Sequence, residues 1–125
     1  MFLIKSSILE KLHPEINKVV GAVKTAIDER RPILVRHHAD ADGFSAGIAL
    51  ERGIKPLLDA KHSRERDLFY YYMRLPLLAP SYTYEDATKD ADRVAKNVVQ
   101  FGMKPPLILI CDTGSGLDSV AGIRK

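Results

Sequence analysis

Residues 36–47, RHHADADGFSAG, decide the fold that the sequence predicts. They follow an apolar run, Pro32-Ile33-Leu34-Val35, which predicts a short buried strand over residues 33–37. Gly43 lets the chain turn sharply, and the residues after it have helical spacing, so we expect a helix over residues 44–52. The histidines and aspartates of this stretch therefore lie where a strand gives way to a helix.

A second apolar run, Leu107-Ile108-Leu109-Ile110, predicts a strand buried on both faces, and Asp112 follows it. Single apolar stripes predict helices over residues 15–30, with Pro14 in the first turn, and over residues 84–101. Strands that alternate with helices favour an α/β fold, here a doubly wound and mainly parallel sheet with helices on both faces. Ligands of such sheets bind beyond the carboxyl ends of the strands, where this chain has its aspartates.

The segments between these elements are less regular. Gly53 is expected to close the helix that follows Gly43, and residues 54–60 admit a short strand. Residues 62–73 predict a helix that packs its aromatic side chains on the sheet, although basic and aromatic side chains together also suit single-stranded nucleic acid. The proline-containing residues 74–83 predict a loop.

Composition sets limits on the class of protein. The 125 residues suit one domain, and 46% hydrophobic and 28% charged residues are typical of a globular chain rather than a disordered one. A net charge of +3 and a pI near 9.0 permit a polyanionic partner without requiring one. The one cysteine, Cys111, excludes an intrachain disulfide and favours a cytoplasmic, reducing compartment. No apolar run approaches the roughly 18 residues of a membrane span.

The residues His38, Asp40 and Asp42 form an H-x-D-x-D pattern that predicts a divalent metal site. Alternate side chains of an extended segment share one face, so three oxygen and nitrogen ligands can converge. Carboxylates with one imidazole suit manganese or magnesium. Asp112, at the second strand end, could bridge two metal ions about 3.5–4 Å apart that clamp a phosphate and activate water.

Three other interpretations compete with the metal site. An EF-hand loop counted from His38 needs a glutamate at its twelfth position, where the chain has Ala49, so that interpretation is rejected. Residues 43–47 match the G-x-S-x-G pattern of serine hydrolases, but the chain order Ser45, His62, Asp112 is wrong for that fold. Aspartates at a strand end can also simply cap a helix.

Several neighbouring residues are candidates for binding substrate. Arg36 is expected either to meet a substrate phosphate or to cap the sheet. The backbone of Gly114 and Ser115 could offer N–H groups to a phosphate, and the same residues suit a sharp turn. His37 should point to the opposite side of the strand from His38 and be packed, and Cys111 should be a small buried apolar residue.

These residues resemble the motifs of a known family, the DHH phosphoesterases, which include the RecJ exonucleases. Residues 36–54, RHHADADGFSAGIALERGI, are similar to the first motif of the archaeal RecJ-like branch, and residues 107–116, LILICDTGSG, to its second. The resemblance implies a doubly wound sheet and two manganese ions, with magnesium as an alternative. His38 and Asp40 would bind one ion, Asp42 the other, and Asp112 would bridge them.

The same resemblance implies the chemistry and the partners. Asp40, Asp42 and Asp112 would be catalytic in the cleavage of phosphodiester or phosphoanhydride bonds, with metal-bound hydroxide as the nucleophile. The substrate would be single-stranded DNA or RNA, and the partners would be replication proteins. A non-catalytic nucleic-acid-binding or replication scaffold module of the same fold is the alternative.

The Asp-His-His motif that gives the family its name is not found in this sequence. Residues 1–125 are therefore expected to form one domain that is the N-terminal portion of a DHH phosphoesterase domain, without its third motif or its C-terminal substrate domain. On this interpretation the chain alone would be nearly inactive as a nuclease. It would also self-associate through the sheet edge and the apolar surface left uncovered.

Overall fold

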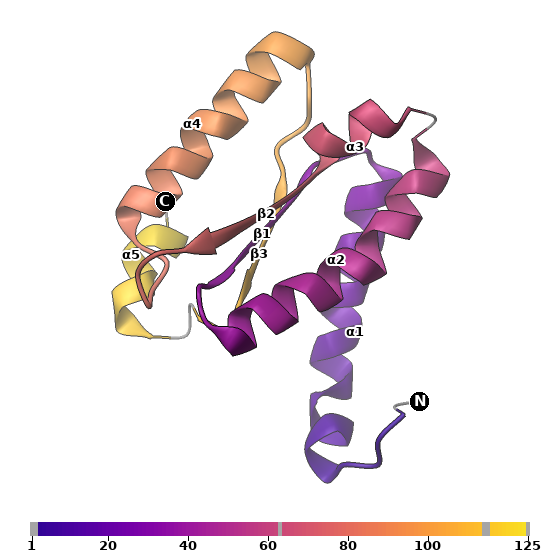
Figure 1. Ribbon diagram of the computed structural model, residues 1–125, viewed down its shortest axis with the longest axis vertical. Coiled ribbons are helices and arrows are strands. Elements are labelled where there is room, and N and C mark those ends of the chain that lie inside the picture. Colours follow the sequence, from indigo (N-terminus) through magenta and orange to yellow (C-terminus); the bar gives the residue numbers. More distant parts are fainter. Residues whose placement is uncertain (1–2, 63, 114–115, 125) are drawn as a thin grey trace.

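A parallel three-stranded sheet lies at the centre of the computed structural model, which describes residues 3–62, 64–113 and 116–124. The strand order is β2-β1-β3 (Figure 1). The strands are β1 (Ile33–His38), β2 (Tyr72–Leu77) and β3 (Leu107–Cys111). Ile33 of the central strand stands opposite Tyr72 on one side and Leu107 on the other. Because both pairings are parallel, the carboxyl ends of all three strands share one edge.

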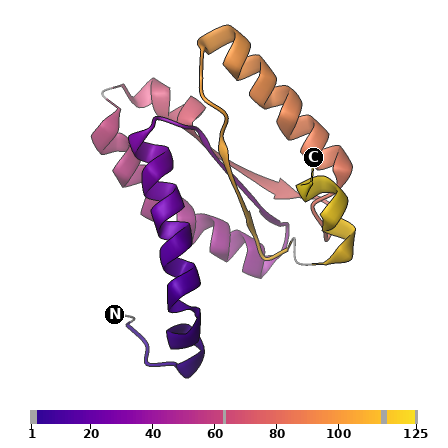
Figure 2. The ribbon, with the colours of Figure 1, turned by 180° about the vertical axis from the view of Figure 1, so that it is seen from behind.

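Helices cover both faces of this sheet, as the sequence predicts. On one face pack α1 (Ser7–Asp28) and α2 (Ala41–Lys61), and on the other α4 (Tyr84–Phe101) and α5 (Val120–Ile123), as Figures 1 and 2 show from opposite sides. The short α3 (Glu65–Tyr71) leads into β2, and a 3-10 turn, η1 (Leu117–Ser119), precedes α5. The α/β fold class with a parallel sheet is therefore confirmed.

The main core lies between the sheet and the α1–α2 layer. Ile33 and Val35 of β1 point into it, where they meet buried side chains of α1 and α2, with Val23, Ala26, Ile27, Ile54, Leu58 and Tyr72 as its other members. A smaller cluster of Leu77, Tyr82 and Ala87 lies under α4. Burial on both faces explains why the central strand reads as a continuous apolar run.

The helix α1 begins earlier than the sequence predicts. Ser6 caps it by accepting a hydrogen bond from the backbone N–H of Leu9 at 3.5 Å, and Pro14, expected in the first turn, lies inside the helix. The N-terminal half of α1 projects beyond the sheet (Figure 1), and its apolar residues Ile8 and Leu12 are exposed. The expected start near residue 15 was wrong because Ser6 caps the helix about two turns earlier, before the apolar residues of α1 that pack on the core.

The helix α2 is more than twice as long as expected. It runs through Gly53 and Pro56 to Lys61, so the expected stop at Gly53 and the short strand after it are both wrong. Ile54 and Leu58 are one helical turn apart and both are buried in the main core. Packing of these two side chains therefore outweighs the local preferences of glycine and proline.

The strand β2 was missed altogether. The expected helix over residues 62–73 ends at Tyr71, and residues 72–77 form the strand in place of a loop. Pro76 is tolerated because β2 lies at the edge of the sheet, where one side of the strand needs no hydrogen-bond donor. The pairing that forms this strand comes from β1, far away in sequence.

The helix α4 and the strand β3 agree closely with expectation. Helix α4 spans the expected residues, with a capping box between Thr83 and Asp86 and a left-handed Gly102 (φ 62°) after its end. Strand β3 lies at an edge of the sheet, and its expected burial on both faces was wrong because Ile108 is 37% exposed. A groove of about 520 Å³, lined mainly by apolar residues of β3, α4 and α5, runs along it. In the described residues, no helix is long and apolar enough to cross a membrane.

Candidate metal centre

Three of the four predicted metal ligands meet at the carboxyl edge of the sheet. His38 ends β1, Asp40 is the residue before α2, and Asp112 directly follows β3. One ligand atom of each lies within 4.8 Å of the others. Within the part of the chain that the structure describes, this is the one such group of histidine, cysteine and acidic side chains.

Asp40 both caps a helix and binds its neighbour. Its Oδ1 accepts a hydrogen bond from the backbone N–H of Gly43 at 2.9 Å, and its Oδ2 lies 2.8 Å from His38 Nδ1. The Gly43 hydrogen bond, followed by the His38 contact, lowers the pKa of the Asp40 carboxyl below its usual 3.8. The capping role expected of a strand-end aspartate is thus present together with the candidate ligand role.

Asp112 has an unusual backbone and a shifted pKa. Its φ of 59° lies in the left-handed region, which aspartate tolerates better than most residues other than glycine. Reduced solvation and, next, the charge of Asp40 raise the pKa of the Asp112 carboxyl. The two neighbouring carboxyls are thus shifted in opposite directions, as expected for a pair that competes for one proton. A divalent cation would neutralise the same pair.

Asp42 lies outside this cluster. It belongs to the first turn of α2 and is exposed. Its charge is nevertheless among those that raise the pKa of Asp112, so it stands near the same edge. The structure therefore places Asp42 beside the site rather than among the converging ligand atoms.

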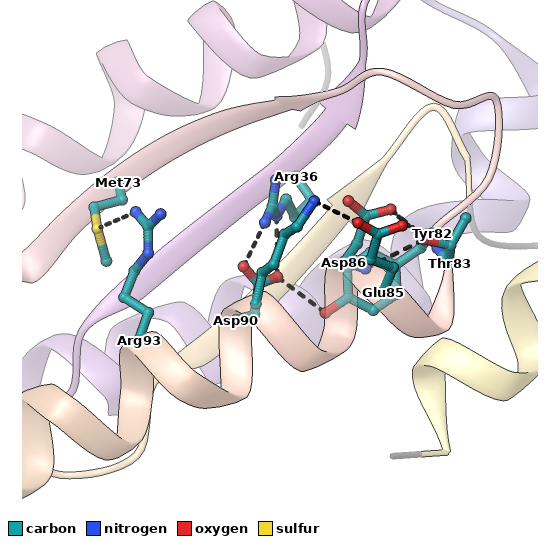
Figure 3. A network of polar contacts seen from close by, with 9 residues as sticks. Arg36, Met73, Tyr82, Thr83, Glu85, Asp86, Asp90 and Arg93 are labelled. Carbon is teal, nitrogen blue, oxygen red and sulfur yellow. Dashed lines mark hydrogen bonds and ion pairs between the residues drawn. The ribbon is translucent and has the colours of Figure 1, made fainter.

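Arg36 lies on the face of the sheet that α4 covers. It forms a two-pronged ion pair with Asp90, and both side chains are buried (Figure 3). The hydroxyl of Tyr82 donates a hydrogen bond to Asp90 at 3.0 Å. Arg36 therefore joins the sheet to α4, and contact with a substrate phosphate stays a prediction. Asp90 was not singled out from the sequence, although it follows Ala87 by three residues on the packed stripe of α4.

The remaining candidates are the serine-hydrolase residues, the cysteine and the glycine–serine turn. The hydroxyl of Ser45 donates to the carbonyl of Ala41 at 2.7 Å, and His62 follows the opposite end of α2, so no serine-hydrolase arrangement forms. Cys111 is half-buried, and burial raises the pKa of its thiol. Gly114 and Ser115 lie outside the described residues.

Comparison with known proteins adds the fold's identity. No family model matches the chain. A solved chain described as the DHH domain of a member of the s1p family of ribosomal proteins superposes with a TM-score of 0.96 at 38% identity. The fold is that of a DHH domain. The superposition covers 99% of this chain and 28% of the solved one.

A curated relative is also similar to this chain in sequence. An uncharacterized protein of Methanocaldococcus jannaschii is 40% identical over 124 residues, which are 99% of this chain and 16% of the relative. The chain thus spans less than a third of either relative. The solved neighbour thus confirms the fold expected from the two motifs. In this chain, His38, Asp40 and Asp112 lie at the carboxyl edge of the sheet.

Proposed function

We propose that this DHH domain contributes the first ligands of the metal centre of a phosphoesterase. The observation that carries the proposal is the convergence of His38, Asp40 and Asp112 within 4.8 Å at the carboxyl edge of a parallel sheet. Two strands that are separate in sequence deliver these side chains to one point. That arrangement is expected of a binding site, because a helix cap needs only one of the two aspartates.

The donor set fits a divalent cation. Two carboxylates and one imidazole are ligands that manganese and magnesium accept, and the nitrogen donor favours manganese. The Asp40 contact holds the His38 ring in place, and Asp112 adds a second charge beside Asp40. When bound, such an ion supplies Lewis-acid stabilisation of a phosphoryl oxygen and activation of water. Asp42, nearby in the first turn of α2, is the proposed ligand of a second ion.

The proposed substrate is a phosphodiester of single-stranded nucleic acid, cleaved in the manner of the archaeal RecJ-like branch. The two motifs support this assignment, and the mildly basic chain is compatible with a polyanion. The solved relative is described as a member of a family of ribosomal proteins. This description supports nucleic acid as the substrate class and makes RNA a candidate substrate beside DNA. Replication proteins are the proposed partners.

Manganese binding is the first test of the proposal. We would titrate the full 125-residue chain with Mn²⁺ and follow free Mn²⁺ by electron paramagnetic resonance. Asp40→Asn and Asp112→Asn should each weaken binding by about tenfold or more, since each removes a charged ligand. Asp59→Asn removes a charge from an exposed position of α2 and is the matched control, which should bind like wild type.

Labelled single-stranded DNA and RNA then test the reaction. Because the sequence lacks an Asp-His-His motif, we expect residues 1–125 alone to cleave poorly, and cleavage that is robust, EDTA-sensitive and abolished in Asp40→Asn would show the site to be complete. Binding of either strand without any need for Mn²⁺ would favour a non-catalytic module. Equal manganese affinity in wild type and both aspartate variants would contradict the proposed centre.

A further inference from the structure

His37 directly precedes the candidate ligand His38 in β1 and is fully buried. Its side chain lies on the face of β1 opposite Arg36, against α2, and none of the residue is exposed. The ring of Phe44 meets it edge-on at 4.9 Å between centroids. A Cβ atom on Gly47 would come within 2.6 Å of the ring carbon Cδ2, so α2 approaches the imidazole as closely as a glycine allows. The ring therefore packs tightly against α2.

Both nitrogens of this ring have defined partners. Nδ1 lies 2.7 Å from the backbone carbonyl oxygen of His38, and Nε2 lies 3.2 Å from Nη1 of Arg74. A carbonyl oxygen only accepts hydrogen bonds and a guanidinium only donates them. The two contacts are thus both satisfied when Nδ1 donates to the carbonyl and Nε2 accepts from Arg74.

Arg74 is itself held in place. Its Nε donates to Glu51 at 2.7 Å, and Lys55 donates to the same carboxylate at 2.7 Å. The hydrogen bonds from Lys55 and Arg74 lower the pKa of Glu51, which keeps this carboxylate charged. A chain of contacts therefore runs from α2 through β2 to the imidazole of His37.

We propose that His37 is a positioning residue for the metal centre. Through its Nδ1–H it holds the carbonyl of His38 and so fixes the turn that carries His38 and Asp40. Gly43 closes the other side of that carbonyl, because a Cβ there would lie 2.1 Å from its oxygen. The inference rests on the proposed metal centre. In it, Arg74 determines which ring nitrogen of His37 carries the proton, because Arg74 donates to Nε2 and leaves the proton on Nδ1.

Two substitutions separate the hydrogen bond from the packing. The side-chain amide nitrogen of asparagine can take the place of Nδ1, whereas that of glutamine takes the place of Nε2. We expect His37→Gln to weaken Mn²⁺ binding by about tenfold or more and His37→Asn to stay within about threefold of wild type. His62→Asn, at the far end of α2, is the matched control and should bind like wild type.

Hydrogen exchange of the Gly43 amide gives a readout that needs no metal. This amide donates to Asp40 and reports how well the turn is held. It should exchange faster in His37→Gln than in His37→Asn or wild type. The inference is overturned if the two variants match each other in both readouts. If wild type binds no Mn²⁺, the proposed metal centre fails, and Gly43 exchange alone decides whether His37 positions the turn.

Discussion

Asp40 and Asp112 follow different strands, yet one carboxyl oxygen of each lies within 4.8 Å of the other. This proximity brings the ends of β1 and β3 together. Reduced solvation and, next, the charge of Asp40 raise the pKa of Asp112, whereas the Gly43 hydrogen bond and the His38 contact lower the pKa of Asp40. Such a pair is costly without a cation and favourable with one. The relationship leads to predictions about stability as well as binding.

The first prediction concerns pH. A carboxyl whose pKa is raised in the folded state favours folding below its usual pKa and loses that contribution as pH rises through the raised value. The metal-free Asp112→Asn variant should therefore match wild type in acid and become relatively more stable as pH rises through the raised pKa of Asp112. Asparagine also tolerates the left-handed backbone of this residue. Urea unfolding across pH checks this, and a variant that loses stability relative to wild type as pH rises would contradict it.

Asp40 should behave in the opposite way. Its pKa is lowered, so its contribution is present above the usual value of 3.8 and is lost as pH falls through the lowered one. Metal-free Asp40→Asn should consequently be less stable than wild type near neutral pH, with the difference closing in acid. The same urea series measures it. A difference that is independent of pH would show that the cap, and not the charge, is what stabilises the fold.

A third prediction concerns Arg36 and Asp90, the buried pair in Figure 3. Asp90→Ala leaves a buried guanidinium unpaired and should lower the free energy of unfolding by about 3–5 kcal/mol. Replacing both residues, Arg36→Met with Asp90→Leu, should cost much less because no charge stays buried. Chemical denaturation measures both variants. A single variant that costs no more than the double one would show that the pair does not tie the sheet to α4.

A fourth prediction concerns two glycines of α2. Gly43→Ala should destabilise the fold by roughly 1–3 kcal/mol because its Cβ would meet the carbonyl oxygen of His38 at 2.1 Å. Gly53→Ala is the matched control, since nothing lies within 4 Å of a Cβ there. It should stabilise the helix by about 0.4–1 kcal/mol. Thermal melts of the two variants decide, and effects of the same sign would contradict the close approach at Gly43.

Self-association is a fifth expectation. Strand β3 offers an open edge beside the apolar groove under α4, and Ile108 is partly exposed there. Ile108→Lys should shift the chain towards monomer in analytical ultracentrifugation, because a lysine on an edge strand opposes pairing. Val99→Lys, on an exposed position of α4 outside the groove, is the control. A wild-type chain that is monomeric at all concentrations would refute this expectation.

Much of the site could be predicted from sequence because parallel strands end at one edge. That rule brings Asp112 to His38 and Asp40 without any knowledge of the structure between them. Strand β2 was not predicted because the aromatic residues before it favour a helix and Pro76 favours a loop. Its pairing partner, β1, is also distant in sequence. The full length of α2 was not predicted because Gly53 and Pro56 are typical of a helix end. The helix continues because Leu58 is buried in the core, a tertiary contact that the local sequence does not reveal.

The most direct test of the central claim is where manganese binds. Nuclear magnetic resonance of the full chain with substoichiometric Mn²⁺ shows which signals the paramagnetic ion broadens. We predict that broadening is strongest at His38, Asp40 and Asp112, the three residues whose ligand atoms lie within 4.8 Å of one another, and that Asp112→Asn reduces it. Broadening that is centred on other acidic residues, or unchanged in Asp112→Asn, would contradict the account.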